Sequence, residues 1–153
     1  MRWVIWWEVE YEMTDVETEY ILDSWYVAGL SSDFEQSLKS VKLLEEPIVF
    51  FRTESGEPVA LEDACPHRKL PLSCGRLNDS VVECGYHGLT FDKTGRCVYS
   101  PTQPESIPNV GVKSYPVVDR YGLLWIWMGD ASLANPNEIF HIENYDNPTW
   151  GKT

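Results

Sequence analysis

The chain has 153 residues, and its 43% hydrophobic and 24% charged side chains are typical of a globular protein and exclude a disordered one. This length suffices for one compact domain with its own core. Because the formal net charge of −12 repels phosphate backbones and anionic lipid surfaces, we expect neither nucleic acid nor a membrane as a partner. The surplus acid either keeps the chain in solution or provides a docking surface for a basic partner.

Residues 1–23 are interpreted as an N-terminal extension. The apolar run 3–7 is too short to span a bilayer, and it lacks the length and cleavage site of a signal peptide. We therefore expect a cytoplasmic protein whose natural start is Met13, with residues 1–12 as an upstream in-frame addition.

The first half of the remaining chain is rich in strand signals. Residues 33–40 predict a short helix or loop, and 53–57 (TESGE) predict a hairpin turn. Aromatic and β-branched runs predict strands at 41–44, 47–52 and 59–62, and a buried aromatic strand or turn at 24–30.

The second half alternates strands with turns. Strands are predicted at 80–83, 89–91, 97–99, 112–118 and 123–128. Turns are predicted at 92–95 and near 120–122, and the loop at 100–109 contains three prolines. Beyond Gly129 we expect loop with one helical turn. The fold class predicted is all-β, a small antiparallel β-sandwich.

Two short loops each combine one cysteine with one histidine. The first reads Cys65-Pro66-His67, and the second, after sixteen intervening residues, reads Cys84-Gly85-Tyr86-His87. Gly85 and Gly88 would allow tight backbone turns beside a metal. Two thiols and two imidazoles suit either a tetrahedral zinc ion or a Rieske-type [2Fe–2S] cluster with cysteines on one iron and histidines on the other. Because each loop supplies one residue of each kind, the spacing favours the cluster; four unrelated buried residues are the third interpretation.

The segment CPHRKLPLS…CGYHGLTFD resembles the Rieske domain of ring-hydroxylating and O-demethylating oxygenases. SWYVAGL at 24–30 resembles the N-terminal signature of vanillate-demethylase-type subunits. YPVVDRYGLLWIWMGD at 115–130 is similar to the strand pair that closes that domain, and ENYDNPTW at 143–150 to the approach to the next one. The resemblance implies a Rieske fold over residues 24–130, with a cluster-binding subdomain made of the two Cys/His loops.

The resemblance also implies function. The [2Fe–2S] ligands would be Cys65, His67, Cys84 and His87. Arg68 matches the residue after the first histidine, where it either tunes the cluster or serves as a surface charge or a loop hydrogen-bond donor. The family's catalytic iron needs two histidines and a carboxylate. Only His141 remains here, beside Glu143 and Asp146, so we expect it to be a surface residue and no mononuclear iron site in this chain. Residues 131–153 would begin a linker to a missing catalytic domain.

The expected role is one-electron transfer within an oxygenase component, an oxidoreductase. The partners implied are a reductase or ferredoxin that donates electrons, and two further copies in a full-length homotrimer. The substrate class would be aromatic, with methoxy- or halo-substituted acids suggested by analogy. The alternative is a stand-alone Rieske ferredoxin, a carrier without catalysis.

Six further positions complete the expectations. Cys74 and Cys97 are predicted to be buried free thiols. High-potential Rieske proteins carry an extra cysteine in each loop, and the matching residues here are Leu70 and Tyr86, so no disulfide is expected. Those proteins also carry Ser and Tyr, whose hydroxyls donate hydrogen bonds to the cluster sulfurs, where this chain has Leu89 and Phe91. Because these two side chains donate no hydrogen bond, we expect a low reduction potential for the cluster.

Overall fold

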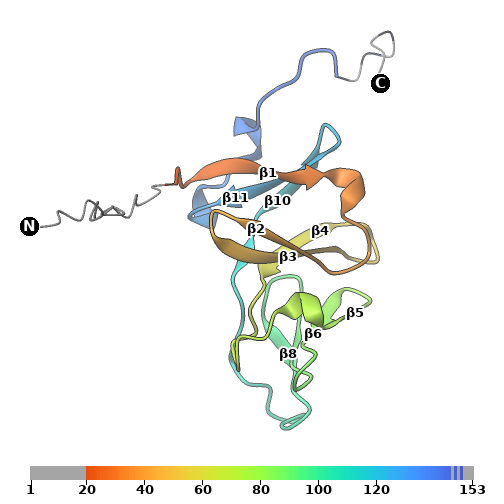
Figure 1. Ribbon diagram of the computed structural model, residues 1–153, viewed down its shortest axis with the longest axis vertical. Coiled ribbons are helices and arrows are strands. Elements are labelled where there is room, and N and C mark those ends of the chain that lie inside the picture. The colour runs from red at the N-terminus through yellow and green to blue at the C-terminus, as the bar shows by residue number, and fades with distance from the viewer. Residues whose placement is uncertain (1–19, 146, 148, 150–153) are drawn as a thin grey trace, which may run out of the picture.

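The computed structural model describes residues 20–145, 147 and 149, and these form three antiparallel sheets stacked along the long axis of the molecule (Figure 1). The expectations for residues 1–19, for Asp146 and for the end of the chain lie outside the described residues. The described part contains strands and short 3-10 turns but no α-helix, as the all-β prediction requires, and no helix in it is long and apolar enough to cross a bilayer.

The first sheet has the order β1-β11-β10, with β1 at Ser24–Leu30, β10 at Val117–Arg120 and β11 at Leu123–Met128. In β11 the alternate residues Leu124, Ile126 and Met128 are fully buried and face the second sheet. A two-residue turn joins β10 to β11, and positive φ at Tyr121 (60°) and Gly122 (70°) matches the twist of a tight hairpin.

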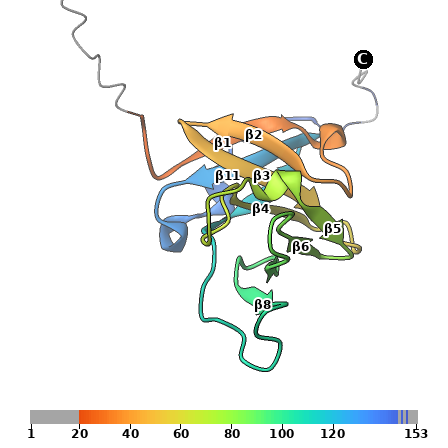
Figure 2. The same ribbon diagram turned by 60° about the horizontal axis from the view of Figure 1, so that its bottom comes forward.

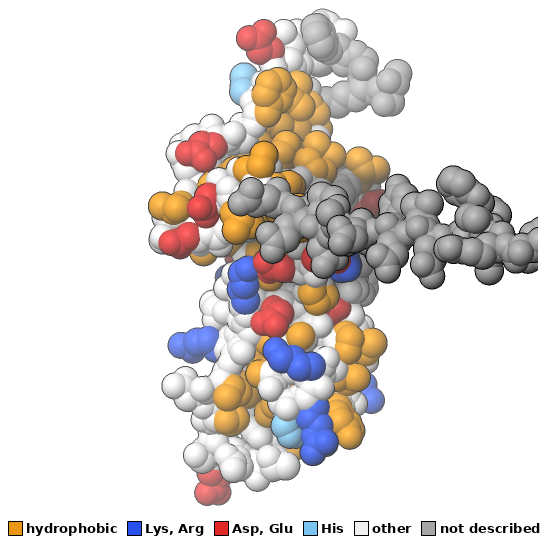
Figure 3. Space-filling model, turned by 60° about the vertical axis from the view of Figure 1, so that its left-hand side comes forward, with side chains coloured by type: hydrophobic (Ala, Val, Ile, Leu, Met, Phe, Trp, Pro, Cys, Tyr) orange, Lys and Arg blue, Asp and Glu red, His pale blue; other side chains and the backbone are white. Residues whose placement is uncertain are grey.

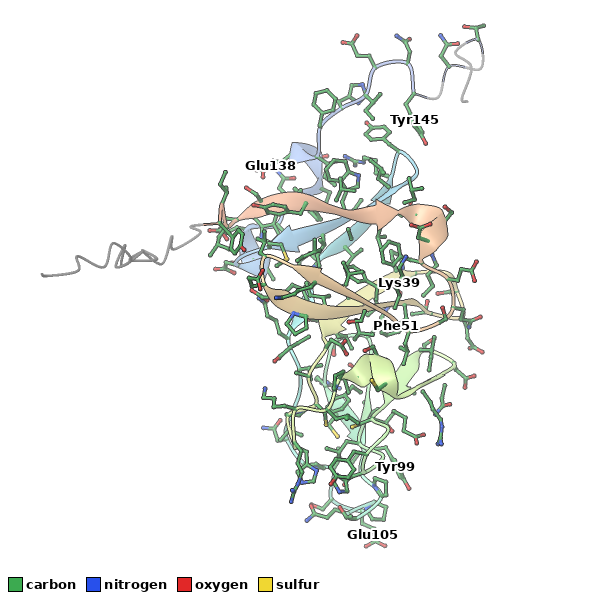
Figure 4. All side chains as sticks on the ribbon, in the orientation of Figure 1. Lys39, Phe51, Tyr99, Glu105, Glu138 and Tyr145 are labelled. Carbon is green, nitrogen blue, oxygen red and sulfur yellow. The ribbon has the colours of Figure 1, made fainter. Side chains whose placement is uncertain are left out.

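The second sheet has the order β2-β3-β4-β9, with β2 at Lys39–Leu43, β3 at Glu46–Arg52, β4 at Pro58–Glu62 and β9 at Ser114–Tyr115. Its strand β3 is buried on both faces. Ile48 and Phe50 pack toward the first sheet, whereas Val49 and Phe51 pack toward the third. The second sheet therefore contributes one face to each of two hydrophobic cores. Figure 4 shows Phe51 on the face that is turned toward the third sheet.

The third sheet, β5-β6-β7-β8, is built from short strands at Arg76–Asn78, Val81–Glu83, Thr90–Phe91 and Cys97–Tyr99. The two Cys/His loops lie between β4 and the 3-10 turn η2 (Leu72–Cys74), and between β6 and β7. After β8 the chain forms a long loop that extends beyond the sheets before it returns to β9 (Figure 2).

Two predictions about the strands were wrong in detail. The run 112–118 is not one strand, because Pro116 has no N–H to donate and the chain changes sheet there. Tyr115 pairs with Ala60 in the second sheet, and Val117 pairs with Ile126 in the first. The strand β5 was also missed, since its residues Arg-Leu-Asn include no β-branched or aromatic side chain.

The segment after β11 contains two 3-10 turns, η3 (Ala131–Leu133) and η4 (Pro136–Glu138), rather than one helical turn. Each begins with a side-chain cap, from Asp130 and from Asn135. The indole N–H of Trp25 donates to the Asn135 carbonyl at 2.9 Å. This contact holds the segment to the first sheet, at the end of the molecule opposite the Cys/His loops.

Candidate metal centre

The first Cys/His loop is closed by a reciprocal pair of backbone hydrogen bonds. The N–H of Cys65 donates to the Leu70 carbonyl at 2.9 Å, and the N–H of Lys69 donates back to the Cys65 carbonyl at 2.8 Å. Lys69 completes the reversal with φ of 57°, a conformation unusual for a residue with a side chain. The loop is therefore a tight, self-supporting turn that presents the residues between Cys65 and Lys69 at its tip.

The second loop repeats this frame. The N–H of Cys84 donates to the Leu89 carbonyl at 2.8 Å, and the N–H of Gly88 donates to the Cys84 carbonyl at 3.0 Å. Gly88 has φ of 71°, and a Cβ at this position would lie 2.8 Å from Cγ of Pro101. The left-handed conformation thus favours glycine and the close approach of Pro101 leaves no room for a Cβ, as the sequence pattern indicated.

The four predicted ligands come together, and they divide by type. Cys65 and Cys84 are each 2% exposed and belong to the core between the second and third sheets. His67 and His87 are exposed, and their ring centroids lie 4.6 Å apart. All four line one cavity, together with Arg68, Leu70, Tyr86 and Leu89. Thiols therefore form its inner side and imidazoles its outer side.

The surroundings of Cys65 oppose its ionisation in the metal-free chain. Burial raises the pKa of the Cys65 thiol, and the adjacent Cys84 thiol acts in the same direction. Backbone N–H groups of His67 and Arg68 donate to the Cys65 sulfur and partly offset this rise. Such donors also stabilise a thiolate once a metal is bound, because they place partial positive charge against the sulfur.

This donor set fits a Rieske-type [2Fe–2S] cluster. In such a centre two thiolates hold one iron and two imidazoles hold the other, so the two ligand types must lie on opposite sides of the cluster. The inner thiols and outer imidazoles of this cavity have that arrangement. A tetrahedral zinc ion would use the same donors but gives no reason to keep the two types apart.

An open groove adjoins the imidazoles. Its lining contains no Asp, Glu, Lys or Arg, and consists of Pro66, His67, His87, Leu89, Ser100, Thr102, Gln103, Pro108 and Val110. The part contributed by the loop at 100–110 was not recognised from the sequence as belonging to the site. Figure 4 places Tyr99 and Glu105 at this end of the molecule, away from Glu138 and Tyr145.

The remaining cysteines and histidine were predicted with mixed success. Cys97 is buried, with 9% of its surface exposed, as predicted. The prediction of a buried thiol was wrong for Cys74, which is exposed at the end of η2. His141 is exposed and accepts or donates a hydrogen bond at 2.9 Å with the Tyr121 hydroxyl. It lies at the end of the molecule opposite His67 and His87.

A buried carboxylate close to the first loop was missed. Asp63 is 3% exposed and has hydrogen-bond partners in two other segments. An acidic residue in a polar-looking sequence gives no sign of burial, so only its position two residues before Cys65 could have drawn attention to it.

Comparison with known proteins agrees with this geometry. The family described as Rieske [2Fe-2S] domain matches residues 24–116. The toluene-4-sulfonate monooxygenase system iron-sulfur subunit of Comamonas testosteroni is 43% identical over 132 residues, which cover 86% of this chain and 38% of that protein. A vanillate O-demethylase oxygenase subunit of a Pseudomonas species is 41% identical over 129 residues, covering 84% of this chain and 36% of that protein.

Solved structures show the same fold. Apo dicamba monooxygenase superposes with a TM-score of 0.80 at 38% identity, over 84% of this chain and 40% of that one. The oxygenase of carbazole 1,9a-dioxygenase in a ferredoxin complex gives 0.66 at 31% identity, over 71% of this chain and 29% of that one. The chain thus spans well under half the length of these relatives. With the family match over 24–116, the fold and the paired Cys/His loops in agreement, the chain belongs to the Rieske [2Fe-2S] domain family.

Proposed function

We propose that Cys65 and Cys84 bind one iron of the [2Fe–2S] cluster, that His67 and His87 bind the other, and that the chain transfers single electrons as the N-terminal part of an aromatic-ring hydroxylating or O-demethylating oxygenase. The observation that carries this proposal is the division of the cavity into buried thiols and exposed imidazoles. The cluster supplies a one-electron couple when bound.

The protein's own contribution is to shape the approach to that couple. Because the imidazoles are exposed and the thiols are not, a partner can come close to the centre only from the histidine side. The groove beside His67 and His87 has no charged lining residue, so a partner that docks there can displace water from it at little cost. The same groove would bring the histidine side against a neighbouring catalytic domain.

The domain boundaries belong to the same proposal: an extension at 1–23, the Rieske domain at 24–130, and a linker beginning at 131–153. The catalytic mononuclear iron would lie in a part of the oxygenase outside this chain. Support comes from the histidine count, because the chain has three and the cluster takes two. Relatives of the kind named above are oxygenase components, and the chain matches little more than a third of the curated ones.

A reductase or ferredoxin would supply the electrons, and the full-length protein would form a homotrimer. The carbazole 1,9a-dioxygenase oxygenase, which shares this fold, is known in complex with a ferredoxin. A cytoplasmic location is proposed because Cys65 and Cys84 contact each other and would tend to form a disulfide in an oxidising compartment before iron arrived.

The experiment that tests the ligands is metal analysis of the chain reconstituted with iron and sulfide. We expect about two irons and two sulfides per chain, by the stoichiometry of the cluster, with a red-brown colour. Serine at Cys65 or at Cys84 should abolish this iron binding. A colourless protein that holds one tightly bound zinc would contradict the proposal.

Charge near the groove bears on the electron donor. Residues 63–113, between β4 and β9, hold six Lys and Arg side chains against five Asp and Glu, although the whole chain holds 12 against 24. Basic side chains gather around a histidine at this end of the molecule (Figure 3). Arg68 forms no ion pair with another described residue, and Lys69 is 70% exposed beside Glu62. This local balance favours an acidic donor over the basic partner that net charge alone would suggest.

The matching experiment compares two charge reversals. Arg68→Glu should slow the bimolecular reduction of the cluster by an acidic ferredoxin, with a weaker salt dependence, because an attractive contact is lost. Lys42→Glu makes the same change on the distant β2 strand and should have little effect. Equal rates for both variants would argue against docking beside His67.

A further inference from the structure

We propose that Asp63 is a positioning residue for the metal centre: its buried carboxylate fixes the distance between the two cluster loops by tying the first loop to the turn η2, which in turn packs against the second loop. This inference rests on the proposed ligands but concerns a residue outside them. The carboxylate is 3% exposed and lies at the end of β4, two residues before Cys65.

The first link joins Asp63 to η2. The backbone N–H of Ser73 donates to Oδ1 of Asp63 at 2.7 Å, and the Ser73 hydroxyl donates to Oδ2 at 2.7 Å. The Ser40 hydroxyl on β2 also donates to Oδ2, at 2.7 Å. Three donors therefore converge on one buried carboxylate from two other segments, and no buried side-chain polar atom among the described residues lacks a partner.

The second link joins η2 to the loop that carries Cys84. A Cβ at Gly85 would lie 2.9 Å from the Cys74 carbonyl oxygen, and a Cβ at Gly75 would lie 2.0 Å from the Glu83 carbonyl oxygen. Residues 74–75 and 83–85 thus touch backbone to backbone, with no side chain between them. Figure 1 shows the η2 turn between the second sheet and the strands β5 and β6.

These links form one continuous support. From Asp63 the contacts pass through Ser73 to residues 74–75, and from there to the residues on both sides of Cys84. Hydrophobic packing assists, because Leu72 is fully buried in the core that contains Cys65 and Cys84. Packing alone, however, allows small sliding movements, whereas short hydrogen bonds to a carboxylate set a distance and a direction.

The alternative is that Asp63 merely stabilises the fold. Asp119 provides a control outside the cluster loops, because its side chain, although 36% exposed, also accepts short hydrogen bonds from other segments, at 2.6 Å from Ser31 Oγ and 2.6 Å from Arg52 Nη2. Asp119 lies on β10, where it joins the first sheet to the second. Its loss should weaken the fold without loosening the cluster loops.

The test uses the full chain in two forms. In the cluster-free chain, Asp63→Ala should speed hydrogen exchange at the amides of Gly75 and Cys84 at least tenfold, and Asp119→Ala should leave those amides close to the wild-type rate. In the reconstituted chain, Asp63→Ala should lose iron to EDTA at least tenfold faster, again unlike Asp119→Ala. Asp63→Asn should restore both rates to within a few-fold, because its carbonyl can still accept from the Ser73 N–H.

Ser73→Ala covers the case in which Asp63→Ala does not fold, since it removes a single hydroxyl and should raise both rates in the same direction. The proposal is overturned if exchange and iron loss follow thermal stability alone, so that Asp63→Ala and Asp119→Ala of similar stability behave alike. If the wild-type chain binds no iron, the proposed ligands fail, but the exchange comparison in the cluster-free chain still decides the role of Asp63.

Discussion

Lys69 and Gly88 hold the same place in the two cluster loops, each four residues after a buried cysteine and each with positive φ, 57° and 71°. The shared frame demands a left-handed residue, and only the second loop uses glycine for it. A non-glycine residue in this conformation costs about 1–2 kcal/mol. Lys69→Gly should therefore leave the free energy of unfolding unchanged or raise it by up to about 1 kcal/mol, measured by urea titration.

Gly88→Ala is the opposite case, because its methyl group would meet Pro101 at 2.8 Å in addition to the backbone strain. We expect a loss of at least about 1 kcal/mol and weaker iron retention. A marked loss of stability in Lys69→Gly, or full tolerance of alanine at Gly88, would show that the two loops do not share the frame described.

The four cysteines should separate into two functional classes. Cys74 is exposed, and Cys97 is buried but does not line the cavity of the four proposed ligands, so serine at either position should leave about two irons per chain. Serine at Cys65 or Cys84 should remove them. Thiol titration of the unfolded, iron-free chain should count four free thiols, and a bridge between Cys74 and Cys97 would contradict this.

The reduction potential should lie near the bottom of the Rieske range of roughly −150 to +300 mV. Leu89 lines the cavity and Phe91 is fully buried in the core with Cys65, and neither side chain can donate a hydrogen bond to a sulfur. Phe91→Tyr, alone and with Leu89→Ser, should raise the potential by tens of millivolts. A hydrogen bond to a charged group is worth about 1.5–3 kcal/mol, and a tenfold shift in a one-electron equilibrium is about 59 mV.

Redox titration checks this expectation, with iron content as the control for an intact cluster. A wild-type potential well above zero would contradict the low-potential assignment. No rise in either variant would mean that a hydroxyl at these positions does not reach the sulfurs.

Stability should depend on pH through Asp119. Burial alone would raise the pKa of Asp119, but the Ser31 hydrogen bond and the Arg52 guanidinium outweigh it and hold the pKa below its ordinary value. A lowered folded-state pKa gives stability that is present above the unfolded value of about 3.9 and is lost as pH falls through the folded value. In the cluster-free chain, the stability difference between wild type and Asp119→Asn should be steady near neutral pH and shrink below about pH 4. A difference that persists undiminished at lower pH would contradict this origin.

Local patterns predicted the strands that lie inside one sheet, except β5, and failed where one β-rich run contributes to two sheets. The bounds predicted at 24–30 and 123–128 are those observed, because aromatic and large aliphatic side chains are concentrated in both runs. Pro116 divides a continuous β-rich run between two sheets, and no local feature indicates which partner each half will choose. Strand pairing is a tertiary property, so the division was visible only in the structure.

The site shows the same limit. Ligand chemistry and spacing predicted Cys65, His67, Cys84 and His87 as a set, because two matched Cys/His loops are rare by chance, and the fold brings these four residues to one cavity. Burial of Asp63 and exposure of Cys74 were not predictable, since both depend on how η2 packs between the two loops. The sequence thus predicted the groups proposed to bind the metal, but not the residues that pack and hydrogen-bond around the loops.

The shared strand β3 has a consequence for how the fold avoids mispairing. Its two faces carry similar pairs, Ile48 with Phe50 and Val49 with Phe51, so sliding the strand by one residue would offer each core nearly the same volume and hydrophobicity. Core composition therefore discriminates poorly between the correct alignment and its nearest competitor. The discrimination must come from the strand's ends, where the β2–β3 turn at 44–45, with φ of 47° and 65°, and the hydrogen-bonded turn at 53–57 fix the chain length available on either side.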